Sequence, residues 1–139
     1  MNWHKDGADS ARRGYHHGNL REALIEAALR LIAEKGPAGF SFAEAARSAG
    51  VSAAAPYRHY RDRDALIADV AKRGYEMFAA ALAAAWAGGT PTPRVAFDRL
   101  GAAYLEFARA YPSHFSAMFE SGISLSAFPE VHAVGEEAF

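Results

Sequence analysis

The 139-residue chain contains no cysteine, which excludes disulfide bonds and metal sites built on thiolates. It also lacks a long hydrophobic run. The longest apolar stretch, Met77 to Ala87, is rich in alanine and too short to cross a bilayer. The first twenty residues have no apolar core of the kind that a secretory signal needs. We therefore expect a cytoplasmic protein with no membrane partner.

Motifs typical of enzymes are missing as well. The sequence has no G-x-S-x-G, no phosphate-binding glycine loop, no H-E-x-x-H and no paired carboxylates. Asp62 and Asp64 are accounted for by helix capping and the helix dipole. Neither the adjacent His16 and His17 nor the widely spaced His114 and His132 form a metal-ligand pattern. We expect no enzymatic activity, no metal and no cofactor.

The charge of the chain is unevenly distributed. Its net charge is −1, but residues 1–64 carry +2 and residues 65–139 carry −3. Between Arg47 and Arg63 there are four arginines and one aspartate, together with His59. A local basic cluster of this kind favours a nucleic-acid partner, although an ordinary solvated surface would look similar.

The spacing of apolar residues predicts helices throughout the chain. From Leu20 to Ile32 they recur at helical intervals, with Asn19 as the N-cap and Gly36-Pro37 as the end. Ser41 and Glu44 form a capping box for a second helix that ends near Ala49. Since no segment alternates like a strand, we predict an all-α fold.

Further helices follow the same signals. Ser52 is expected to cap a third, tight or 3₁₀-like helix containing Pro56, and Asp62 to cap a long fourth helix. Thr92-Pro93 opens a fifth helix, which Pro112 ends. Residues 113–120 form a short sixth helix, and a seventh starts at Pro129 and is still running at residue 139, so the chain looks incomplete at its C-terminus. Gly74 in the fourth helix would allow close packing against a neighbour.

Residues 41–57 predict a helix-turn-helix, because two helices joined by a short glycine-containing turn cross steeply. The second helix would enter a major groove, where alanine lets the backbone approach closely and contacts thymine methyl groups. Alanine makes no bidentate hydrogen bonds, so DNA shape or the N-terminal arm would supply much of the specificity. The aromatic and basic side chains that follow would bond to phosphate. The candidate DNA-binding residues are Ser41, Ser52, Ala53, Ala54, Tyr57, His59, Tyr60 and Arg63.

Residues 15–71, which include FSFAEAARSAGVSAAAPYRHYRDRDAL, resemble the N-terminal DNA-binding domain of the TetR/AcrR family of bacterial transcriptional regulators. The ordered set of capped helix, A-x-x-x-G turn, V-S, Y-x-x-Y and R-D-x-L carries the resemblance. It implies a repressor that binds a palindromic DNA operator as a homodimer and is released by a small-molecule effector. It also implies an arm at residues 1–14, a helix-turn-helix domain at 15–64 and part of a ligand-binding domain at 65–139. The helices that form the dimer in this family would lie beyond this sequence.

Aromatic residues after residue 70 are candidates for an effector pocket, which would take an apolar or aromatic small molecule. An ordinary hydrophobic core is the alternative, because aromatic stripes at helical spacing are usually buried. Tyr104 and Tyr111 are favoured for the pocket, since a buried hydroxyl needs a partner. A helical protein-interaction module that has lost DNA binding is a further alternative for the whole chain. The candidate ligand-binding residues are Phe78, Trp86, Tyr104, Phe107, Tyr111, Met118 and Phe119.

Overall fold

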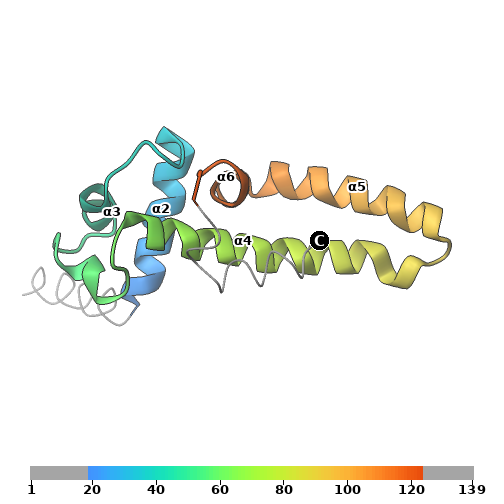
Figure 1. The fold of residues 1–139 in the computed structure, drawn as a ribbon, viewed down its shortest axis with the longest axis horizontal. Coiled ribbons are helices and arrows are strands. Elements are labelled where there is room, and N and C mark those ends of the chain that lie inside the picture. The colour runs from blue at the N-terminus through green and yellow to red at the C-terminus, as the bar shows by residue number, and fades with distance from the viewer. Residues whose placement is uncertain (1–18, 124–139) are drawn as a thin grey trace, which may run out of the picture.

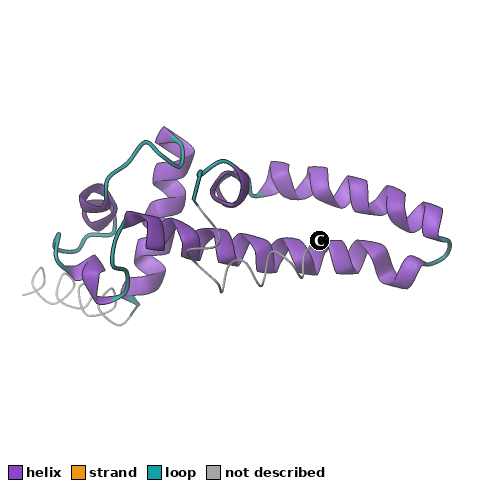
Figure 2. Ribbon diagram, in the orientation of Figure 1, coloured by secondary structure: helices purple, strands orange, loops and turns teal. Residues whose placement is uncertain are grey.

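The computed structural model describes residues 19–123, and within that range every regular element is helical. The all-α prediction is confirmed. Figure 2 shows helices joined by short loops, with no strand among the described residues. The elements are α2 Leu20–Lys35, α3 Phe42–Ser48, the 3₁₀ helix η1 Ala55–Arg58, α4 Arg63–Trp86, the 3₁₀ helix η2 Ala87–Gly89, α5 Pro93–Ala110 and α6 Pro112–Phe119.

The helices form a compact head and a long two-helix arm (Figure 1). Helices α2 and α3, together with η1, gather around the first turns of α4. The rest of α4 extends away from them, and α5 returns alongside it. Helix α6 then lies against both α4 and α2, which brings the end of the described chain back to the head.

Local sequence signals account for most helix ends. The Asp62 side chain accepts a hydrogen bond from Ala65 N at 2.9 Å, and Thr92 accepts one from Val95 N at 3.3 Å. Both predicted caps are therefore confirmed. Asn19 occupies the N-cap position of α2, but its side chain makes no capping hydrogen bond there. Its backbone carbonyl still accepts the first bond of the helix, from Ala23 N at 2.9 Å.

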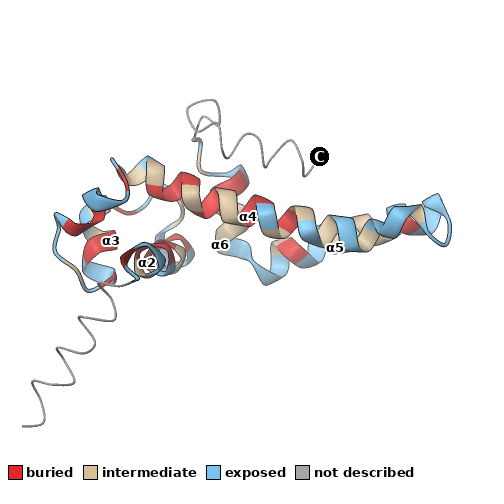
Figure 3. Ribbon diagram, turned by 90° about the horizontal axis from the view of Figure 1, so that it is seen from below, coloured by how far each residue is buried: buried red, intermediate tan, exposed pale blue. Residues whose placement is uncertain are grey.

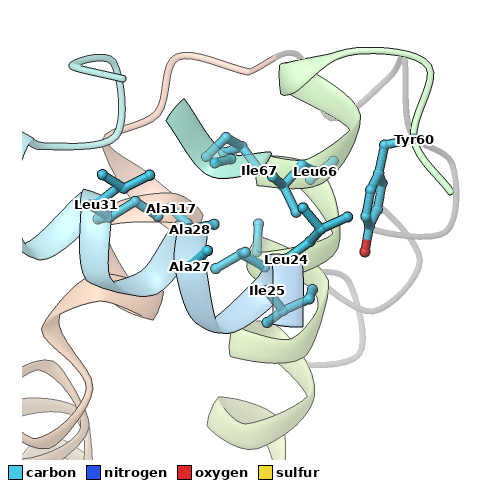
Figure 4. Packing of buried hydrophobic residues seen from close by; sticks show 14 of the residues in the cluster. Leu24, Ile25, Ala27, Ala28, Leu31, Tyr60, Leu66, Ile67 and Ala117 are labelled. Atoms are coloured by element: carbon cyan, nitrogen blue, oxygen red, sulfur yellow. The ribbon is translucent and has the colours of Figure 1, made fainter. Parts of the chain in front are cut away.

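The core is one continuous cluster of apolar side chains from α2, α3, η1, α4, α5 and α6. Figure 4 shows Leu24 and Ala28 of α2 facing Leu66 and Ile67 of α4, with Ala117 of α6 at the far side. The boundary predicted between residues 64 and 65 falls inside the first turn of α4. Helix α4 therefore belongs to the head and to the arm at once.

Exposure differs between the two parts of the molecule. Figure 3 shows buried residues concentrated in the half of α4 next to the head, and exposed residues along most of α5. Phe97 and Leu105 of α5 are 68% and 66% exposed. The guanidinium of Arg99 joins the two helices near their tip, with Nε donating to the Ala85 carbonyl at 2.8 Å.

None of the described helices is both long and apolar enough to span a membrane. The helix predicted from Pro129 lies outside the described residues.

The close approach of α6 to α4 depends on Gly74, as its sequence position suggested. A Cβ atom at this position would lie 2.6 Å from the sulfur of Met118 and 2.9 Å from its Cγ. Met118 is buried, so it has little room to move. By contrast, a Cβ atom on Gly101 in α5 would meet nothing within 4 Å.

The two glycines should respond oppositely to alanine. Gly101→Ala should raise the free energy of unfolding by about 0.5–1 kcal/mol, the usual gain for alanine in a helix. Gly74→Ala should give no gain and a net loss of up to about 2 kcal/mol, because overpacking against Met118 opposes the same helical gain. Urea unfolding of both variants checks this, and equal stabilisation at the two positions would contradict the close packing of α6 on α4.

Candidate nucleic-acid interface

The turn after α3 has the geometry that the sequence predicted. Ser41 Oγ accepts from Glu44 N at 3.1 Å, which confirms the cap of α3. Gly50 has a φ of +75° and turns the chain, with Val51 N bonded to the Ala46 carbonyl at 3.0 Å. Arg30 of α2 fixes the end of α3 by donating to the carbonyl and hydroxyl of Ser48, each at 3.1 Å. Helix α3 is thus held firmly on α2.

The third helix is a 3₁₀ helix, as predicted, but it starts later than expected. It is the four-residue 3₁₀ helix η1, whose N-cap position is Ala54. The prediction that Ser52 caps it is wrong, because the hydroxyl of Ser52 makes no hydrogen bond in the described part of the chain. Pro56 explains the difference, since it cannot donate an amide hydrogen bond and disfavours an α conformation in Ala55. Ala53 and Ala54 therefore lie in the turn that leads into η1, where both are exposed.

Exposed residues of α3, the turn after it and the segment around η1 make up a candidate contact surface, which we call the reading face. The ring of Tyr57 packs edge-on against Phe42 at a centroid distance of 5.0 Å, which ties η1 to the start of α3. Tyr57 is nevertheless 62% exposed. An open hollow between α3 and the turn is lined by Ala43, Arg47 and Ala53, among others. The reading face consists of Ser41, Ala43, Arg47, Ser52, Ala53, Ala54, Tyr57, Arg58 and His59, all of which are exposed.

Two arginines of this face, Arg47 and Arg58, are absent from the predicted list of DNA-binding residues. Arg58 ends η1, and Arg47 lies on α3 beside the hollow. Arg58 makes no ion pair with any described residue. Arg47 contributes by its charge to the lowered pKa of Glu44, whose main cause is the hydrogen bond from Lys35. The sequence feature that could have identified Arg47 and Arg58 as candidates is their place in the basic cluster between residues 47 and 63.

Tyr60 has a different role from the one predicted. Its side chain is 7% exposed, and its hydroxyl donates to Asp69 Oδ2 at 2.6 Å. The prediction that it donates to phosphate is therefore wrong. Burial is the main reason that the pKa of its hydroxyl is raised, and the bond to Asp69 raises that pKa further. Figure 4 shows the ring at the edge of the core beside Leu24.

The guanidinium of Arg63 is directed inward as well. Its Nε donates to the Phe40 carbonyl at 2.7 Å, and its carbon lies 4.7 Å from the centre of the Phe40 ring. Nη1 reaches Asp64 at 3.4 Å, and Nη2 is buried. This geometry anchors the start of α4 to the loop before α3, so it does not support the predicted phosphate contact of the side chain.

The predicted ligand-binding residues are only partly brought together. Phe78 lies within 5.1–6.3 Å of Phe107, Tyr104 and Phe119, measured between ring centres. Met118 is buried beside this aromatic cluster, and Tyr111 packs on Phe107 at 5.3 Å. Trp86 lies apart from it, at the tip of the arm against Gly89.

Tyr75, which was not among the predicted ligand-binding residues, is buried, unlike Tyr104 and Tyr111. Tyr104 and Tyr111 are 39% and 44% exposed, so neither is the buried tyrosine that the sequence suggested. Tyr75 of α4 is buried, and its hydroxyl donates to the Met118 carbonyl at 3.1 Å. Burial raises the pKa of this hydroxyl.

Among residues 19–123 no group of three or more histidines and carboxylates could hold a metal ion. His16 and His17 lie outside the described residues.

Comparison with known proteins agrees with this architecture. Residues 24–70 match the family model of the bacterial regulatory proteins, tetR family. No curated protein matches the chain. A solved structure of a protein of unknown function from Rhodococcus sp. RHA1 is 35% identical, with a TM-score of 0.73. The match covers 89% of this chain and 64% of that one.

Two further structures show the same fold at lower identity. PfmR, a TetR family transcriptional regulator from Thermus thermophilus, is 21% identical with a TM-score of 0.68, over 83% of this chain and 63% of its own. A TetR family transcription regulator from Marinobacter aquaeolei is 24% identical with a TM-score of 0.66, over 85% and 62%. The chain thus spans less than two thirds of each of these three structures. The match to a family of regulatory proteins agrees with the expectation that the chain is not an enzyme.

The two serines at the reading face should differ in their effect on stability. Ser41→Ala should cost about 1 kcal/mol in the free energy of unfolding, because it removes the cap of α3. Ser52→Ala should stay within about 0.5 kcal/mol of the wild type, because its hydroxyl bonds to no described residue. Thermal unfolding of both variants checks this. A larger loss at Ser52 than at Ser41 would mean that the turn before η1 is capped after all.

Proposed function

We propose that this chain, a member of the tetR family of bacterial regulatory proteins through its residues 24–70, belongs to a transcriptional regulator that binds DNA through its reading face. The observation that carries the proposal is the pairing of a rigid support with exposed phosphate-binding side chains. Ala55, Pro56 and Tyr60 are buried and hold η1 in place, while Tyr57, Arg58 and His59 remain exposed. Side chains of these types bond to phosphate oxygens.

The reading face divides its contacts by residue type. Ala43, Ala53 and Ala54 allow close approach to base edges and contact thymine methyl groups. Arg47, at the rim of the hollow, can bond to guanine or to phosphate. Tyr57 has its ring fixed by Phe42 and its hydroxyl available, so it can reach a phosphate at little entropic cost. Shape and deformability of the DNA then contribute to specificity.

Regulation requires more of the protein than the described helices. Two copies in a homodimer would place their reading faces in successive major grooves of a palindromic operator, about 34–36 Å apart. A small apolar or aromatic effector near the aromatic cluster around Phe78 would favour a different spacing and release the DNA, which is repression relieved by ligand. Such a ligand shifts the balance only by its different affinity for the two states, typically about 1–3 kcal/mol.

Fluorescence anisotropy of the full-length protein tests the proposal. The probes are DNA from upstream of its own gene and a scrambled duplex, each measured over a series of salt concentrations. A preference for the upstream fragment of about 10³ or more, with affinity that falls steeply with salt, supports a sequence-specific regulator. Equal weak binding to both duplexes would favour the alternative, a helical interaction module without sequence-specific DNA binding.

One arginine of the reading face can be compared with a matched arginine elsewhere. Arg58→Ala should weaken binding to all duplexes similarly and reduce the slope of log affinity against log salt by about 1, because one phosphate contact is lost. Arg94→Ala is the control, since Arg94 is also exposed but lies in the first turn of α5, at the tip of the arm. Loss of DNA affinity in the Arg94 variant but not in the Arg58 variant would place the DNA on another surface.

A further inference from the structure

A charged cluster joins three segments of the head at one carboxylate. Asp69 of α4 accepts from Arg21 of α2 twice, Nε to Oδ2 at 2.9 Å and Nη2 to Oδ1 at 3.1 Å. It also accepts the hydroxyl of Tyr60, which follows η1, at 2.6 Å. The Asp69 side chain is 10% exposed. We call these three residues the Asp69 tie.

The surroundings of Asp69 make its partners necessary. Its neighbours on α4, Ala68 and Val70, are buried in the core. A carboxylate in this position loses its water and must be compensated by hydrogen bonds and an opposite charge. Arg21 supplies the charge in a bidentate geometry, and Tyr60 supplies a third donor. Without Arg21 or Tyr60, the Asp69 carboxylate would lack part of the charge or hydrogen bonding that replaces water. We therefore expect the three side chains to keep this one geometry.

Tyr60 is the point at which η1 is attached to α4. The amides of His59 and Tyr60 both bond to the Pro56 carbonyl, at 3.1 Å and 3.0 Å, so Tyr60 closes η1 and moves with it. Beyond Tyr60, Arg61 and Asp62 are exposed until α4 begins. The bond between Tyr60 and Asp69 therefore links the end of η1 to α4.

We propose that Asp69 is a positioning residue for DNA binding, which fixes η1 and its exposed Tyr57 and Arg58 in place through Tyr60. The effect on DNA rests on the proposed function, whereas the effect on η1 does not.

Tyr60→Phe tests the tie with little risk to folding, and the chain offers a matched control. The variant removes one oxygen, keeps the buried ring and leaves the pair of Arg21 with Asp69. Tyr75→Phe removes the same atom from another buried tyrosine of the same core, whose hydroxyl bonds to the Met118 carbonyl. A purely structural role would give both variants the same behaviour. Asp69→Asn is the second variant, because it keeps an acceptor for Tyr60 and loses the charge that Arg21 pairs with.

Hydrogen exchange of the free full-length protein is the first measurement. Tyr60→Phe should speed amide exchange in residues 57–60 about five- to tenfold, the loss expected for one hydrogen bond, and Asp69→Asn should do so as well. Tyr75→Phe should leave these amides unchanged. Unchanged exchange in both Tyr60→Phe and Asp69→Asn would overturn the tie.

DNA affinity is the second measurement, made by anisotropy with a duplex that the wild-type protein binds. Tyr60→Phe should weaken binding about five- to tenfold at a temperature where all variants are folded, and Tyr75→Phe should not. Faster exchange with unchanged affinity would overturn the positioning role. If the wild type binds no duplex while exchange still rises in Tyr60→Phe, the proposed function fails and the attachment of η1 by Asp69 stands.

Discussion

The packing of the first turns of α4 against α2 is the constraint on which the rest of the structure depends. Leu66, Ile67 and Val70 have no exposed surface, and Leu66 and Ile67 face a similarly buried Leu24. Each such side chain contributes about 1.5–3 kcal/mol by leaving water. This contact fixes the direction of α4, and α4 in turn carries Asp69 on one side and the aromatic cluster further along. Helix α4 is therefore shared by the head and the arm.

The supporting and contacting residues of the head are separate groups. Tyr60 and Arg63 look like DNA contacts in the sequence, but they bond inward and hold the loops around α3 and α4. Tyr57 and Arg58 remain free to face solvent because those neighbours hold the backbone in place. A short 3₁₀ helix with alanines in front of it is weakly stable by itself. Its attachments, rather than its own hydrogen bonds, therefore determine whether the reading face has a defined shape.

The sequence predicted the helices well and the directions of side chains poorly. Ser41, Asp62 and Thr92 gave the starts of their helices correctly because a cap is a local interaction over three residues. Tyr60 was misassigned because its partner lies nine residues away on another element, beyond the reach of local rules. A signal was present, since Asp69 is the one charged residue in the apolar run from Ala65 to Ala71.

The same limit applies to the candidate ligand-binding residues. Phe78 and Phe107 were predicted in one group of candidates, and their rings do lie together. Helical spacing could not show that Trp86 sits two turns beyond the cluster at the tip of the arm. Nor could it show which tyrosine is buried, because the burial of Tyr75 depends on how closely α6 approaches Gly74. Burial of this kind is a tertiary property, set by residues more than forty positions apart.

A nuclear magnetic resonance titration of the full-length, ¹⁵N-labelled protein with duplex DNA tests the location of the reading face most directly. Chemical-shift changes should concentrate in residues 41–59, largest near Tyr57 and Arg58, while the amides of α5 stay unchanged. Binding accompanied by shifts along α5, with residues 41–59 unaffected, would contradict this location.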